Sequence, residues 1–262
     1  MPTLALNNGR FSYEDAGGSG TPVVAVHGSF GRGTTFNAIA TRLAPDYRVI
    51  APDLRGHGGS DHGGPFDFVA DLAAFIEVLD LAPALVSGHS LGGVTAYRLA
   101  ARRPELVRAM VIEDVGAVTD ETELDHPVLD VTGWPRRFAN RTEATDFFST
   151  TPAPDYFLES VVERPGGWEL LFDLDELMEV QRASAGNWWP DWLASAHPTL
   201  LLRATKSFLL SAGLATDMAT RRPNTELTTL DSGHWMHREA PDSYANAVRG
   251  FLERVTSRRP AG

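Results

Sequence analysis

A glycine-flanked serine is the feature of this chain with the clearest chemical meaning. Residues 88–93 read Gly-His-Ser-Leu-Gly-Gly, after the apolar run Ala84–Val86 and before a helix-like segment. A serine with glycine two positions before and after it, between a strand and a helix, is the pattern of a nucleophile elbow. Glycine is required because side chains at the flanking positions would collide with neighbouring backbone in so tight a turn. The pattern predicts that Ser90 is a nucleophile.

A histidine near the other end of the chain suits the role of its base. Gly233-His234-Trp235 follows the last predicted strand, Thr225–Leu230. A neutral imidazole there can accept the serine proton and later donate it to the leaving group. Eight histidines are present, and the position after the final strand singles out His234. His237 is expected to make a cap or surface contact, and His89 to pack or to touch substrate.

A glycine-rich loop is predicted to complete the site. Residues 27–31 read His-Gly-Ser-Phe-Gly and end the predicted strand Thr21–His27. Acyl transfer requires two backbone N–H donors facing the developing oxyanion. One is predicted to be Leu91, directly after the nucleophile. The other is predicted to be Ser29, with Phe30 as the alternative and with the Phe30 side chain in the pocket or under a cap.

Composition narrows the class of protein. A chain of 262 residues is long enough for one large domain with a buried core. The net charge of −11 disfavours nucleic acid and anionic membranes as partners. Cysteine is absent, which excludes disulfides, a thiol nucleophile and a cysteine-ligated metal. No His-Glu-x-x-His motif or phosphate-binding lysine loop occurs, so neither a metal nor a cofactor is expected. No signal peptide or membrane span is recognised, and a cytoplasmic location is expected.

Apolar runs alternate with helix-like segments, which predicts an α/β fold with a mostly parallel eight-stranded sheet and helices on both faces. Residues 3–14 are expected to form an opening antiparallel hairpin. The expected parallel strands are Thr21–His27, Tyr47–Ala51, Ala84–Ser87, Ala109–Glu113, Pro198–Arg203 and Thr225–Leu230, and helices are expected over Asp67–Leu79 and Asp242–Val255.

The alternation stops between residues 118 and 197. This stretch, called the cap segment below, reads as several helices without a clear strand, and an insertion this long is not a bare loop. Residues 1–117 and 198–262 are therefore predicted to form the core, with 118–197 inserted as a helical cap. Five of the six tryptophans lie in the cap segment. Most of its aromatic residues are expected to form its own core, and others to line an apolar substrate pocket.

Together these motifs resemble the α/β-hydrolase fold superfamily. The resemblance runs from residues 27–28 through Asp53-Leu54-Arg55-Gly56-His57-Gly58 and the elbow to Gly233-His234. It implies that Asp53 and Arg55 brace loops rather than react. It is specific for the fold and poorly specific for the substrate, because this fold hosts many chemistries.

The acid of the expected triad departs from the commonest family pattern. Many members carry an aspartate in a turn after the strand equivalent to Pro198–Arg203, where this chain has Ala204-Thr205-Lys206-Ser207. A subset of the superfamily places the acid one strand earlier, where this chain has Glu113-Asp114, and this chain looks closest to the small serine esterases of that subset. Asp114 is assigned, with Glu113 as the alternative, since adjacent strand residues point to opposite faces. Resemblance to that subset implies that Ser207 hydrogen-bonds the histidine–carboxylate pair, although an ordinary turn residue fits as well.

The activity expected from the resemblance is hydrolysis of a carboxylic ester, thioester or lactone through an acyl-enzyme. The predicted substrate is a small apolar or aromatic ester. Alternatives are carbon–carbon bond hydrolysis of a diketone-type substrate, non-hydrolytic work as a biosynthetic cyclase or perhydrolase, and a ligand receptor. Relatives acting as dehalogenases and epoxide hydrolases use aspartate where this chain has Ser90. The substrate's identity and the oligomeric state stay open.

Overall fold

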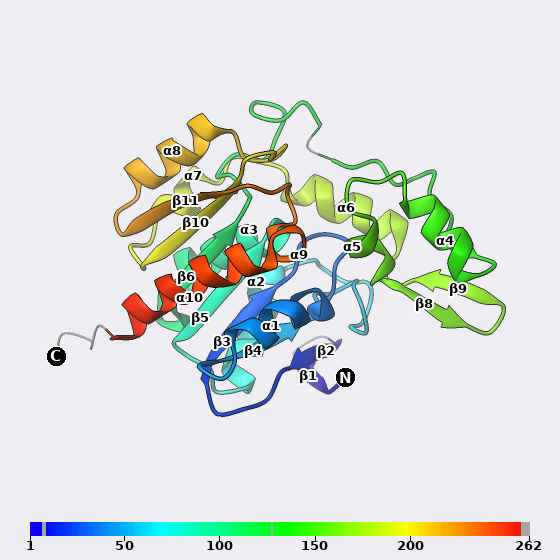
Figure 1. Cartoon of the computed structure of the whole chain (residues 1–262), viewed down its shortest axis with the longest axis horizontal. Helices are drawn as coiled ribbons and strands as arrows, with labels where there is room; N and C mark the ends of the chain where they lie inside the picture. Colours follow the sequence, from blue (N-terminus) through cyan, green and yellow to red (C-terminus); the bar gives the residue numbers. More distant parts are fainter. Residues whose placement is uncertain (7–8, 127, 258–262) are drawn as a thin grey trace.

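An eight-stranded sheet runs through the centre of the molecule (Figure 1). The computed structural model describes residues 1–6, 9–126 and 128–257. The strand order is β1-β2-β4-β3-β5-β6-β10-β11, with antiparallel pairing for β1–β2 and β2–β4 and parallel pairing elsewhere. In chain order the strands are β1 (Thr3–Leu6), β2 (Gly9–Asp15), β3 (Thr21–Val26), β4 (Tyr47–Pro52), β5 (Ala84–His89), β6 (Val107–Glu113), β10 (Thr199–Ala204) and β11 (Thr225–Leu230). The predicted fold class and opening hairpin are confirmed.

Helices cover both faces of this sheet. They are α1 (Asn37–Leu43), α2 (Phe68–Val78), α3 (Leu91–Arg102), α8 (Ala212–Arg221), α9 (Met236–Glu239) and α10 (Pro241–Ser257), with short 3₁₀ turns at Gly33–Phe36 and Pro104–Leu106. Val23 and Ala25 of β3 pack in the cluster that contains α1 and α10. Val24 and Val26 pack in the opposite cluster with α2 and α3. A strand buried on both faces must be apolar at every position, which explains its unbroken hydrophobic run. No described helix has the length and apolar character needed to cross a membrane.

The cap segment contains strands as well as helices. Its helices are α4 (Arg141–Phe148), α5 (Pro154–Leu158), α6 (Leu174–Ser184) and α7 (Trp189–Leu193). Its antiparallel sheet has the order β7-β9-β8, with β7 at Arg137–Phe138, β8 at Val161–Arg164 and β9 at Gly167–Leu170. The expectation that this segment has no clear strand is wrong. The strands have two to four residues each, too short for a period-two pattern to be recognised.

The aromatic residues of the cap segment divide between two cores. Trp134, Phe147 and Trp168 pack in a cluster that consists mainly of cap-segment residues and also contains Phe30 and Trp235. Trp192 packs instead in the main core, edge-on to Tyr97 of α3 at 5.6 Å between ring centroids. Its indole N–H also donates to the Met218 carbonyl in α8. Helix α7 thus packs against the main core, although its sequence lies inside the predicted cap boundaries.

Candidate active site

Ser90 occupies a strained turn between β5 and α3. Its backbone has φ 51° and ψ −117°, a left-handed conformation that a residue with a side chain rarely adopts. A Cβ on Gly88 would lie 2.3 Å from the Gly92 carbonyl oxygen, and one on Gly92 would lie 2.2 Å from that of Val26. Both glycines are therefore sterically required, as the elbow motif predicted. The serine N–H donates to the Glu113 carbonyl, which ties the turn to the end of β6.

The Asp114 carboxylate is the hydrogen-bond partner of the His234 ring. Asp114 Oδ2 lies 2.9 Å from His234 Nδ1, and Asp114 Oδ1 accepts from the Ala204 N–H at 2.8 Å. Asp114 is fully buried, follows β6 directly and has φ 49°, which turns its side chain toward the end of β10. A carboxylate on Nδ1 fixes the tautomer in which Nε2 carries the lone pair. This is the state that a general base requires.

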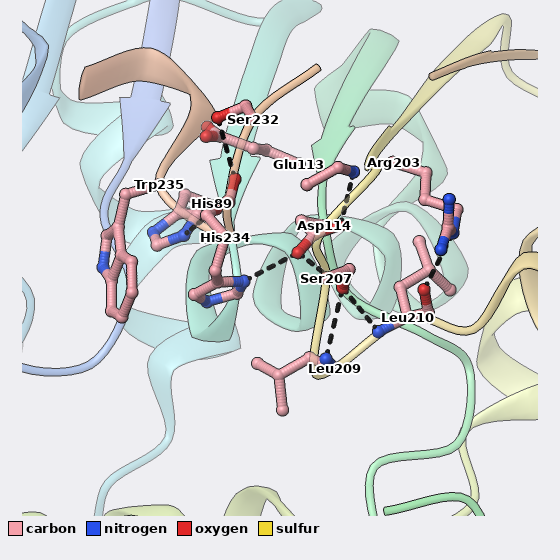
Figure 2. A network of polar contacts seen from close by, with 12 residues as sticks. His89, Glu113, Asp114, Arg203, Ser207, Leu209, Leu210, Ser232, His234 and Trp235 are labelled. Atoms are coloured by element: carbon pink, nitrogen blue, oxygen red, sulfur yellow. Dashed lines mark hydrogen bonds and ion pairs between the residues drawn. The ribbon is translucent and has the colours of Figure 1, made fainter. Parts of the chain in front are cut away.

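Ser207 also binds Asp114. Its hydroxyl donates to Asp114 Oδ2 at 2.7 Å, and its Oγ accepts from the N–H groups of Leu209 and Leu210 (Figure 2). The expected contact between Ser207 and the histidine–carboxylate pair is therefore present. Ser207, at the position where the resemblance implies an acid in many members, thus hydrogen-bonds the Asp114 carboxylate at the end of the neighbouring strand.

Glu113, the alternative acid, lies against a different histidine. Its Oε1 accepts from the His237 backbone N–H at 3.0 Å and lies 2.8 Å from His237 Nδ1. Both side chains are fully buried. The expectation of a surface contact for His237 is wrong, because the short helix α9 turns its ring inward to meet the end of β6. The expected contact with the cap is present, since the ring lies edge-on to Tyr156 of α5 at 6.1 Å between ring centroids. The opposite directions of Glu113 and Asp114 follow from the alternation of side chains along a strand.

His89 holds the backbone of His234. Its Nε2 donates to the His234 carbonyl at 3.2 Å, so its Nδ1 carries the lone pair when the ring is neutral. Burial, followed by the neighbouring histidines, lowers the pKa of His89 well below the usual range, which keeps the ring uncharged. His89, Glu113 and His237 offer ligating atoms within 4.8 Å of one another. Since hydrogen bonds already join Glu113 to His237, this cluster anchors the segment that carries His234.

The predicted oxyanion loop is held by the cap segment. A Cβ on Gly28 would lie 3.0 Å from Ser90 Cβ, so glycine allows the loop to approach the nucleophile. The Tyr156 hydroxyl of α5 lies 3.2 Å from the carbonyl oxygens of both Gly28 and Ser29. Ser160 Oγ donates to the Phe30 carbonyl at 2.7 Å. Tyr156 is one of the cap-segment aromatic residues expected to form the cap's own core or to line the pocket, and nothing in the local sequence indicates its long-range contact with the loop.

A cavity of about 490 Å³ brings the predicted residues together. Ser90, His234, Ser29 and Leu91 all line it, as do Phe30 and His89. No hydrogen bond joins the Ser90 hydroxyl to His234 in the described part of the chain, and such contacts often tighten only when substrate binds. The volume is in the range of small-molecule sites. The arrangement can perform nucleophilic acyl transfer.

Known proteins resemble this chain over most of its length. It is 28% identical over 251 residues to the sn-1-specific diacylglycerol lipase ABHD11 of Mus musculus, covering 88% of this chain and 80% of the relative. It is 26% identical over 247 residues to a putative esterase/lipase of Haemophilus influenzae, covering 89% of this chain and 84% of the relative.

Solved structures share the fold. The E-2-(acetamidomethylene)succinate hydrolase matches with a TM-score of 0.88 at 22% identity, over 96% of this chain and 98% of that chain. A marine microorganism esterase matches with a TM-score of 0.78 at 22% identity, over 95% of this chain and 100% of that chain. The model of the Alpha/beta hydrolase family matches residues 23–247. The chain therefore belongs to the alpha/beta hydrolase family.

Proposed function

We propose that this protein hydrolyses carboxylic esters through an acyl-enzyme on Ser90. The observation that carries the proposal is the pairing of His234 Nδ1 with the buried Asp114 carboxylate, beside a cavity that His234 shares with Ser90. A nucleophile, a base and a group that orients the base are the three components of this chemistry.

Acylation begins when the Ser90 hydroxyl attacks the ester carbonyl and His234 Nε2 takes its proton. Negative charge then develops on the carbonyl oxygen, and the backbone N–H groups of Leu91 and Ser29 stabilise it. Leu91 is the first residue of α3, where backbone N–H groups have no partner within the helix. Collapse of the intermediate breaks the carbon–oxygen bond, and His234 gives its proton to the departing alcohol.

Deacylation repeats the same steps with water. His234 takes a proton from water, the hydroxide attacks the acyl carbon, and the proton returns to the Ser90 oxygen as the carboxylic acid leaves. Asp114 stabilises the imidazolium in both halves without itself becoming protonated. Thioesters and lactones fit the same sequence of steps.

The names of the relatives favour esters among these substrates. The mouse relative is a diacylglycerol lipase and the bacterial relative a putative esterase/lipase, each similar over more than four-fifths of this chain. Carbon–carbon bond hydrolysis would be favoured by a cavity lined with aromatic residues of the cap segment. Phe157 is the one aromatic residue of the described cap segment that lines the cavity, so that argument loses its support. No observation favours the cyclase, perhydrolase or receptor alternatives.

Turnover of p-nitrophenyl acetate and butyrate tests the proposal. We expect the wild-type protein to release p-nitrophenol from at least one ester and Ser90→Ala to lose this activity. The matched control is Ser211→Ala, which removes an exposed serine hydroxyl at the start of α8. Equal rates for wild type and Ser90→Ala would overturn the proposal.

A further inference from the structure

The cavity lining has a buried apolar part and an exposed part that contains two carboxylates. The buried lining includes Leu91, Val94, Val115, Leu124 and Phe157. The exposed lining contains Glu123, Asp125 and His126 together with three apolar residues, Leu129, Pro152 and Phe208. None of the lining residues that the structure describes is lysine or arginine. A ligand bound here meets carboxylates at the mouth and no fixed cation.

Hydrogen bonds to α6 hold one residue before and one residue after the two carboxylates in the sequence. Thr119 Oγ1 donates to the Ser184 carbonyl at 2.8 Å. On the other side, the Leu129 N–H donates to Gln181 Oε1 at 2.8 Å, and Gln181 Nε2 donates to the Leu129 carbonyl at 3.0 Å. Ser184 and Gln181 both belong to α6, so this helix holds Thr119 and Leu129, which flank Glu123 and Asp125 in the sequence. We call Glu123 and Asp125 the acidic mouth.

We propose that the site selects uncharged esters and that the acidic mouth rejects esters that carry a carboxylate. This inference rests on the proposed function. A carboxylate that enters the apolar interior loses hydration without gaining a partner. At the mouth it also meets two like charges, and specificity is often built from such repulsion against the wrong ligand. The favoured substrate places its apolar group against the buried lining.

Three p-nitrophenyl esters distinguish the effect of a charge on the acyl group from the effects of its size and polarity. They are p-nitrophenyl hexanoate, the p-nitrophenyl monoester of adipic acid, and the methyl p-nitrophenyl diester of adipic acid. The first is apolar, the second bears a carboxylate, and the third is polar but neutral. For the wild type at pH 8 we expect kcat/KM for the monoester to be at least about ten-fold below that for the neutral diester. The difference is expected to shrink as salt is added, because salt screens exposed charges.

Variants assign the effect to the acidic mouth. The double variant Glu123→Gln/Asp125→Asn removes both charges with little change in shape. We expect the ratio of kcat/KM for the monoester over the diester to rise about five-fold or more in this variant. The matched control is Glu121→Gln, which removes an exposed carboxylate from the same segment that does not line the cavity. It is expected to keep the wild-type ratio.

The outcomes separate this inference from the proposed function. Failure of the wild type to hydrolyse any of the three esters would remove the ester-hydrolase proposal and this one with it. Hydrolysis of monoester and diester at equal kcat/KM would overturn the charge selection alone. An unchanged ratio in the double variant, or an equal rise in Glu121→Gln, would also overturn it, because the discrimination would then arise elsewhere.

Discussion

Ser207 donates a hydrogen bond to Asp114 Oδ2 at 2.7 Å, the same oxygen that lies 2.9 Å from His234 Nδ1. Ser207 and Asp114 follow the ends of two adjacent strands, β10 and β6. Figure 2 shows the Asp114 carboxylate between Ser207 and the His234 ring. A carboxylate held on several sides can orient an imidazole more firmly than one held by the histidine alone.

Replacement of Ser207 by alanine tests that role. We expect Ser207→Ala to lower kcat about ten-fold with little change in KM, because one hydrogen bond to a charged group is lost while substrate contacts stay. Steady-state kinetics with p-nitrophenyl butyrate measure both constants. Ser211→Ala, which removes the N-cap of α8, is expected to cost about 1 kcal/mol of unfolding free energy without lowering kcat. Wild-type kcat in Ser207→Ala would contradict the assignment.

Two substitutions of a carboxylate by an amide test which residue is the acid of the triad. We expect Asp114→Asn to lower kcat on the order of 10⁴-fold, as loss of the carboxylate leaves the histidine in the wrong tautomer. Glu113→Gln keeps an oxygen that can accept from His237, so a far smaller effect on kcat is expected. The reverse order of effects, with Asp114→Asn nearly fully active, would move the acid to Glu113.

The buried Glu113–His237 pair is expected to contribute to stability. Removing either partner leaves a buried polar group without its bond, which typically costs a few kcal/mol. We expect Glu113→Ala and His237→Ala each to lower the unfolding free energy, and the double variant to lose less than the sum. Urea denaturation of the four proteins gives the coupling energy, expected to exceed about 1 kcal/mol. Additive losses would show that the contact contributes nothing of its own.

Much of the fold and part of the site were predictable from local patterns. The elbow at Ser90 and the loop at Gly28 are recognisable because close backbone approach demands glycine at fixed spacings. Apolar runs located the strands because parallel strands are buried on both faces. The assignment of Asp114 as the acid stays a prediction from the resemblance, in which Ser207 stands at the position that implies a carboxylate in many members.

The features that were missed depend on contacts between distant segments. Tyr156 binds the Gly28 loop across 128 residues of sequence, and His237 meets Glu113 across 124. No periodicity or motif in the sequence indicates either contact. The cap strands are too short for their alternation to be read. Trp192 packs in the main core through α3 and α8, which no local signal separates from packing within the cap.

The buried histidines predict a loss of stability in mild acid. Burial lowers the pKa of His57 from 6.5 to about 4, and lowers the pKa of His27 well below its usual range. As pH falls from 6.5 to 4, the unfolded chain binds protons that the folded chain does not, so the unfolding free energy decreases. For His57 alone the full decrease is about 3 kcal/mol.

Urea unfolding at pH 7.5, 6 and 5 measures this decrease. His57→Asn is expected to show a smaller decrease than wild type, even if its stability at pH 7.5 is lower. An unfolding free energy that does not change over this range, or the same change in His57→Asn, would contradict the prediction.

The most direct test of the central claim is the site of covalent modification by an alkyl fluorophosphonate. Intact mass and peptide mapping should show one adduct on Ser90 in the wild type, none in Ser90→Ala, and strongly slowed labelling in His234→Ala. A wild-type protein that carries no adduct on Ser90, or that labels equally fast without His234, would contradict a nucleophile activated by that histidine.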